Sequence, residues 1–176
     1  MATSIPYEPK TVALLVIDMQ ESLRKEVIDI IPNVKSIVKT CHEKDIPVFW
    51  TQHGHRNLKF DGGAVGRWRS STSIDVLDFV IKNKTRYDAF YRTELGSILT
   101  SLGIETLIIS GAETNLCCEA TARSGFDQDY NIVFLKDATV TENEEMHKAT
   151  LLNLEYGVAK IATVTEVIEW LDKRVN

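Results

Sequence analysis

Cysteine is scarce in this chain, and its placement excludes a disulfide framework. The 176 residues contain three cysteines, Cys41, Cys117 and Cys118. Their number is odd, and the adjacent pair matches neither a zinc-type spacing nor a redox C-x-x-C motif. We therefore expect a protein of a reducing compartment, with its thiols free.

Long apolar runs and an excess of positive charge are also missing. The first ten residues, MATSIPYEPK, lack the apolar core of a signal peptide, and no run is long enough to span a bilayer. Twenty basic residues stand against 25 acidic ones, and no basic stripe is present. We therefore expect a cytoplasmic protein with a small-molecule substrate and no nucleic-acid or membrane partner. We also expect a homo-oligomer.

The residues that are present describe one globular α/β domain spanning 1–176. Hydrophobic residues make up 44% of the chain, and there is no repeat, low-complexity tract or linker. Apolar runs alternate with helical patterns, which predicts a three-layer α/β/α sandwich with a central, mostly parallel six-stranded sheet. The expected strands are Thr11–Ile17, Pro47–Thr51, Ile74–Ile81, Glu105–Ile109, Ile132–Leu135 and Val158–Ala162. The expected helices are Glu21–Ile31, Asn33–Lys44, Leu95–Leu102, Asn115–Asp129, Glu142–Tyr156 and Glu166–Lys173.

The segment Thr106–Gln128 (TLIISGAETNLCCEATARSGFDQ) carries the strongest chemical signal. A β-branched strand ends in a Ser-Gly pair, and Cys117 and Cys118 fall in the first turn of the helix that follows. Backbone N–H groups and the positive end of the helix dipole favour a thiolate there, and they could also stabilise an oxyanion. Alternatively, both cysteines are small buried hydrophobic residues. This segment alone leaves the two interpretations open.

Three side chains suited to chemistry follow apolar strands. Asp18 follows the first strand, Lys84 the third and Cys117 the fourth. In an open parallel sheet, the ligand crevice lies beyond the carboxyl ends of the strands. Taken singly, Asp18 could cap the next helix and Lys84 could be a solvated cation. We expect the three strands to be adjacent and central, which favours a shared site.

In this order and spacing, the motifs resemble those of the isochorismatase-like cysteine hydrolases, which include the nicotinamidases. The resemblance covers nearly the whole chain and rests on LLVIDMQ around Asp18, KTRYDAF around Lys84, and GAETNLCCEATAR followed by VFLKDAT. The TNLCCEATAR form is similar to a nicotinamidase-related subgroup of plants and bacteria. The resemblance implies that Asp18, Lys84 and Cys117 form a catalytic triad. It also implies that Cys118, at a position usually filled by Val, belongs to the core.

The same resemblance implies an oxyanion hole, and the chemistry of the residues then indicates a mechanism. It places a non-proline cis peptide at Ala112–Glu113 and makes the Glu113 and Cys117 N–H groups the oxyanion donors. Asp18 would accept the thiol proton, and Cys117 would attack a carboxamide carbon. Asp18 would then protonate the leaving ammonia or amine, and water would hydrolyse the thioester. Lys84 would keep Asp18 ionised and stabilise the thiolate, and no diffusible cofactor is required.

The chain departs from the nicotinamidase pattern at the metal ligands. Nicotinamidases commonly hold a metal with an Asp-x-His pair and a further His, whereas this chain has His53 and His55 in TQHGH. The following Asp61-Gly62-Gly63 offers no third histidine, and a zinc site normally needs three or four protein ligands. His42 and His147 lie in predicted helices. We therefore expect no metal.

We instead expect His53 and His55 to be exposed or to contact substrate. Gln20 and Trp68 are further candidates for substrate binding, whereas Phe90 is expected to pack in the core. The irregular stretch Gln52–Ser73 exceeds ordinary loop lengths, which indicates a lid or binding loop.

The expected function is cysteine-dependent hydrolysis of a C–N bond in nicotinamide or another small carboxamide. One alternative is a true isochorismatase, which cleaves an enol ether and needs acid–base groups rather than a thiol. The thiol of Cys117 counts against that alternative. Another is a non-catalytic redox-sensing protein that uses the vicinal cysteines Cys117 and Cys118, which an intact triad disfavours.

Overall fold

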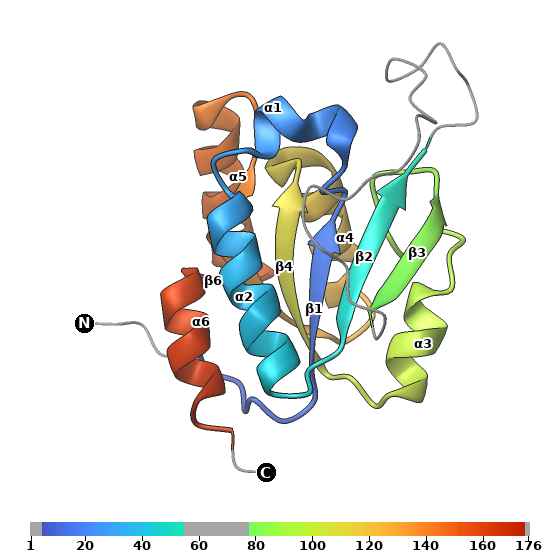
Figure 1. Cartoon of the computed structure of the whole chain (residues 1–176), viewed down its shortest axis with the longest axis vertical. Helices are drawn as coiled ribbons and strands as arrows, with labels where there is room; N and C mark the ends of the chain where they lie inside the picture. Colours follow the sequence, from blue (N-terminus) through green and yellow to red (C-terminus); the bar gives the residue numbers. More distant parts are fainter. Residues whose placement is uncertain (1–4, 55–77, 175–176) are drawn as a thin grey trace.

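The apolar runs of the sequence form a six-stranded sheet in the computed structural model, which describes residues 5–54 and 78–174 (Figure 1). Its strands are β1 (Val12–Ile17), β2 (Val48–His53), β3 (Phe79–Lys84), β4 (Thr106–Ala112), β5 (Asn131–Val140) and β6 (Lys160–Ala162). The strand order is β3-β2-β1-β4-β5-β6, and every pair is parallel. The expected α/β/α sandwich is confirmed, with a wholly parallel sheet.

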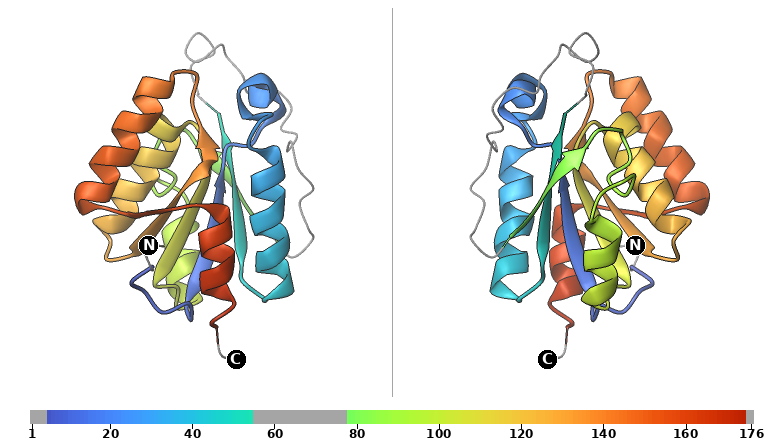
Figure 2. Two further views of the ribbon diagram at one scale, coloured as in Figure 1. Left: turned by 90° about the vertical axis from the view of Figure 1, so that its left-hand side faces the viewer. Right: turned by 90° about the vertical axis from the view of Figure 1, so that its right-hand side faces the viewer.

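Helices cover both faces of the sheet, and Figure 2 shows the two helical layers on either side of it. One layer contains α2 (Ile31–Glu43) and α6 (Val164–Leu171); the other contains α3 (Leu95–Ser101), α4 (Glu119–Phe126) and α5 (Glu144–Gly157). A 3₁₀ turn (Glu21–Leu23) and the short α1 (Arg24–Val27) follow β1. Each layer closes its own hydrophobic cluster over one face, which explains why β1 is apolar at every position.

Two helix starts follow the local chemistry of the chain. Pro32 lies in the first turn of α2, where its missing N–H costs no hydrogen bond. Thr163 caps α6 and exchanges hydrogen bonds with Glu166, so this helix begins before the predicted Glu166. The predicted helix Glu21–Ile31 is wrong as one unit, because a 3₁₀ turn and a four-residue helix take its place.

Strand β3 lies at the edge of the sheet, which corrects the expectation that the three chemical residues end adjacent central strands. β2 separates β3 from β1, because β2 and β3 extend the sheet on one side of β1 while β4, β5 and β6 extend it on the other. Lys84 is also the last residue of β3 rather than a residue after it. A long side chain must therefore cross β2 to reach β1.

Gly111 allows β4 to approach the end of β1 closely. Its φ is +114°, and a Cβ at this position would lie 2.0 Å from the backbone oxygen of Ile17. No side chain fits in that space, and L residues avoid this backbone conformation. The Ser-Gly pair thus brings the turn after β4 against the turn after β1.

Among the described residues, no helix is long and apolar enough to cross a membrane.

Candidate active site

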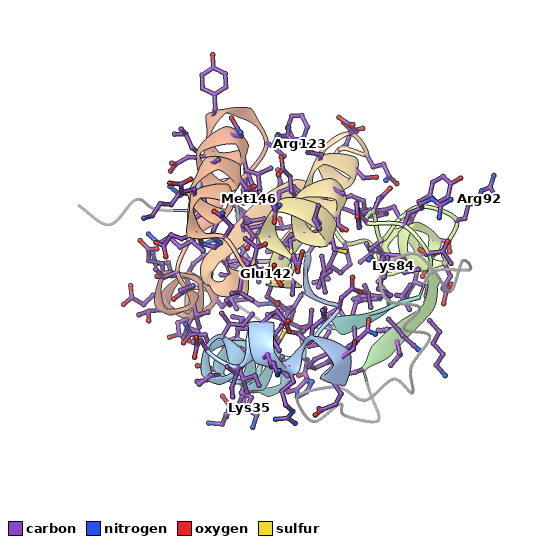
Figure 3. All side chains as sticks on the ribbon, turned by 90° about the horizontal axis from the view of Figure 1, so that it is seen from above. Lys35, Lys84, Arg92, Arg123, Glu142 and Met146 are labelled. Atoms are coloured by element: carbon purple, nitrogen blue, oxygen red, sulfur yellow. The ribbon has the colours of Figure 1, made fainter. Side chains whose placement is uncertain are left out.

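The carboxyl ends of β1, β3 and β4 bring Asp18, Lys84 and Cys117 together. Figure 3 views the molecule from this end, with Lys84 labelled. Asp18 follows β1 directly with φ of +50°, a conformation that a short polar side chain tolerates. Cys117 lies in a π-helical turn (Thr114–Cys118) between β4 and α4. The exposed fractions are 1% for Asp18, 0% for Lys84 and 7% for Cys117.

The ammonium group of Lys84 is the centre of this cluster. Its Nζ donates to Asp18 Oδ2 at 2.5 Å and to Cys117 Sγ at 3.2 Å. A third hydrogen bond, of 3.1 Å, joins Nζ to Nδ1 of His53. The structure therefore brings the three expected catalytic residues together and adds His53 to them.

A bulge in β3 directs Lys84 into this cluster. Thr51 pairs with Ile81 and His53 pairs with Lys84, so β3 contains one more residue than β2 between these pairs. Ile81 and Lys84 are three positions apart, so strict alternation without a bulge would place them on opposite faces of the sheet. The bulge returns Lys84 to the face of Thr51 and His53, a role that bulges often have beside active sites.

The charges of the cluster favour a protonated Lys84. Burial lowers the pKa of this lysine, but the Asp18 carboxylate and the Cys117 sulfur outweigh burial and raise it above its ordinary value. A buried Asp18–Lys84 ion pair is therefore in place before any substrate arrives. Removing either partner would leave the other charge buried and uncompensated.

The thiol of Cys117 differs from the sequence expectation. Burial and the Asp18 carboxylate raise its pKa above the ordinary value, although Lys84 acts in the opposite direction. The expectation that the helix start favours a resting thiolate is wrong for the protein without substrate, because desolvation outweighs the nearby positive charge. A neutral thiol lies beside a carboxylate that can accept its proton.

Thr51 is a site residue that the sequence analysis missed. Its hydroxyl donates to Asp18 Oδ1 at 2.5 Å and accepts from the Asp18 backbone N–H at 3.1 Å. Since Lys84 occupies Oδ2, both carboxylate oxygens have a donor. The available signal was a polar residue ending the apolar run PVFWT at the carboxyl edge.

Gln20 supports the site through the backbone of β2. Its side-chain oxygen accepts from His53 N at 2.7 Å, and its Nε2 donates to the His53 carbonyl at 3.3 Å. The amide of this predicted substrate-binding residue is therefore engaged with β2. Two other predicted substrate-binding residues, His55 and Trp68, lie outside the described residues, as does most of the Gln52–Ser73 loop.

The turn before Cys117 contains the cis peptide bond implied at Ala112–Glu113. The Glu113 carbonyl accepts from the N–H groups of Leu116 and Cys118, which closes the π-helical turn. Assignment of the Glu113 and Cys117 N–H groups to an oxyanion hole stays a prediction. Cys118 is fully buried in the cluster under α3, α4 and α5, as expected for a core residue.

The described residues contain one group of possible metal ligands, and Lys84 already contacts it. Among residues 5–54 and 78–174, one group could supply three metal-ligand atoms within 4.8 Å of one another, namely Asp18, His53 and Cys117. The Lys84 ammonium already contacts all three. His42 bonds to Asp78, and His147 bonds to Thr114 and to the Lys136 carbonyl, so neither joins this group.

Comparison with known proteins matches residues 12–166 to the Isochorismatase domain. The chain is 36% identical over 166 residues to "Nicotinamidase 3" of Arabidopsis thaliana, covering 85% of this chain and 83% of the relative. It is 28% identical over 195 residues to ureidoacrylate amidohydrolase RutB of Methylobacterium radiotolerans, covering 86% and 76%. An isochorismatase-like hydrolase from Alkaliphilus metalliredigens superposes with a TM-score of 0.82 at 27% identity, covering 93% and 97%. The chain is therefore a hydrolase that belongs to the isochorismatase family and is related to nicotinamidases.

Proposed function

We propose that this hydrolase cleaves the C–N amide bond of a small carboxamide through a thioester on Cys117. The observation that carries the proposal is the buried Lys84 ammonium, which donates to both the Asp18 carboxylate and the Cys117 sulfur. A nucleophile, a base and a fixed positive charge thus share one water-poor site. Amide-hydrolysing relatives in the same family support the reaction class.

The first half of the reaction forms the thioester. Because the resting thiol is neutral, Asp18 accepts its proton as the Cys117 sulfur bonds to the carboxamide carbon. The carbonyl electron pair moves to oxygen, and the Glu113 and Cys117 N–H groups stabilise this oxyanion. Asp18 then returns the proton to the departing nitrogen, the C–N bond breaks, and ammonia or an amine leaves.

The second half of the reaction releases the acid. Water attacks the thioester carbon and gives a proton to Asp18, and a second oxyanion forms on the same N–H groups. When the C–S bond breaks, the proton passes to sulfur and the neutral thiol of Cys117 is restored. Lys84 keeps its proton throughout, so its charge compensates whichever of Asp18 and Cys117 is negative.

The proposed substrates are nicotinamide and similar small carboxamides, with ureido acids as a second group to test. One relative is named as a nicotinamidase and another as a ureidoacrylate amidohydrolase, and these names motivate the two groups. We propose that His55 and Trp68 contact the substrate, with Trp68 stacking on a planar ring. Gln20 would act through His53, whose backbone it holds.

Ammonia release across a panel of carboxamides and ureido acids tests this function. Cys117→Ala should lower kcat by more than about 1,000-fold, because it removes the nucleophile. Cys118→Ala is the matched control: it removes a buried sulfur one residue away and should keep most activity. Substantial amide hydrolysis by Cys117→Ala would refute the thioester. Enol-ether cleavage of isochorismate by that variant would favour the isochorismatase alternative.

A further inference from the structure

His53 completes the hydrogen bonding of Lys84. A protonated lysine has three N–H donors and no acceptor, and a buried donor without a partner is costly. Asp18 Oδ2, Cys117 Sγ and His53 Nδ1 each accept from Nζ, so three acceptors match three donors. Two of these acceptors belong to the proposed triad, and the third belongs to His53.

We propose that His53 is a positioning residue that fixes the Lys84 ammonium through Nδ1, and that it is not a metal ligand. The proposal rests on the proposed amide hydrolysis, in which Lys84 must reach Asp18 and Cys117 together. It concerns the position where the resemblance to nicotinamidases would place a metal-binding aspartate. In this chain an imidazole that binds a lysine takes that place.

The hydrogen bond fixes the tautomer of His53. An ammonium group can only donate a hydrogen bond, so the lone pair of Nδ1 must accept it. A neutral His53 ring therefore carries its proton on Nε2. A histidine that binds a metal presents a bare nitrogen to the ion and commonly donates its other N–H to an acceptor. Neither nitrogen of His53 is available in that form while Lys84 is bound to it.

The surrounding structure holds the His53 ring in place. Gln20 binds both the backbone N–H and the carbonyl of His53, and the bulge in β3 pairs His53 directly with Lys84. The ring also stacks near Tyr87, with centroids 6.3 Å apart and planes 22° apart. Backbone and ring are thus both constrained, as expected of a residue that orients another.

Two polar substitutions separate the two ring nitrogens. In His53→Asn, the amide oxygen can replace Nδ1 as an acceptor, whereas in His53→Gln, the longer amide replaces Nε2 and leaves Lys84 without its third acceptor. We expect His53→Asn to keep kcat within about fivefold, and His53→Gln to lower kcat by about 10- to 100-fold, the cost of one unmet buried donor. Thermal unfolding of each variant shows whether folding is intact.

His42→Asn and His42→Gln form the matched control, because His42 also bonds through one ring nitrogen but contacts Asp78 rather than the site. Both control variants should keep the wild-type kcat. Equal kcat for His53→Asn and His53→Gln would overturn the positioning role. One equivalent of zinc in the purified protein, lost from both His53 variants, would overturn the exclusion of a metal. Loss of activity in Cys117→Ala tests the proposed function separately, since it does not depend on His53.

Discussion

Two buried aspartates accept hydrogen bonds from consecutive residues of β2, but their other partners differ. Asp18 accepts from the Thr51 hydroxyl, and Asp78 accepts from the indole N–H of Trp50 at 2.7 Å. Because successive strand residues point to opposite faces, Trp50 lies in the cluster under α2 and α6, and Thr51 faces the other layer. One strand thus holds a carboxylate on each face.

The second partner of each carboxylate makes the difference between them. Asp18 is paired with the fully buried Lys84, whereas Asp78 is bonded to His42, whose side chain is 33% exposed. Each aspartate also raises the pKa of a buried cysteine, Cys117 for Asp18 and Cys41 for Asp78. The sulfur of Cys117 accepts a hydrogen bond from the buried Lys84 ammonium, whereas the positive charge that acts on Cys41 is the guanidinium of Arg174. Under the proposed mechanism, a carboxylate and a thiol react together where a buried ammonium contacts both of them.

Of the changes that test this comparison, the largest effect should come from the Thr51 hydroxyl, which orients Asp18. Thr51→Val keeps the shape of the side chain but removes the donor to Oδ1 and the acceptor for the Asp18 N–H. We expect kcat to fall by about 10- to 100-fold, because the base loses its orientation and a stabilising hydrogen bond. Thr51→Ser should recover most of the activity. Wild-type kinetics in Thr51→Val would remove any functional distinction between the two aspartates.

The corresponding change at the other carboxylate should affect stability instead. Asp78→Asn replaces one oxygen by an NH₂ group that faces a donor, either Trp50 or His42. We expect the free energy of unfolding to fall by about 1–3 kcal/mol with kcat unchanged. Denaturant titration and ammonia release on the same preparation measure both quantities. A tenfold loss of kcat with unchanged stability would contradict a purely structural Asp78.

The smallest effect should appear in thiol reactivity. Burial is the main cause that raises the pKa of Cys117, and the Asp18 carboxylate adds to it. Asp18→Asn should therefore lower that pKa and speed alkylation of Cys117 by iodoacetamide at pH 7 several-fold. Burial is the main cause that raises the pKa of Cys41 to about 12, so Asp78→Asn should leave Cys41 unreactive. Peptide mapping of the alkylated protein distinguishes the two thiols. Slower alkylation of Cys117 in Asp18→Asn would contradict the inference that the Asp18 carboxylate raises the pKa of Cys117.

Local sequence determined the alternation of strands and helices and the positions of Asp18 and Cys117. An apolar run followed at once by Asp18, and a strand, turn and helix start around Cys117, are read from neighbouring residues. The motifs around them led to the isochorismatase family, which the matched domain confirms. The expected first helix was wrong because a short 3₁₀ turn interrupts it, and weak local preferences decide such ends.

Tertiary structure alone decided how those residues meet. The strand order places Lys84 on an edge strand, and one extra residue in β3 turns its side chain onto the face of Thr51 and His53. The pKa of Cys117 likewise depends on burial and on Asp18, 99 residues away in the sequence. Register, desolvation and charge pairing are long-range properties. The sequence by itself therefore determined which groups could react, and the packing of the sheet determined their orientation and the proton on the thiol.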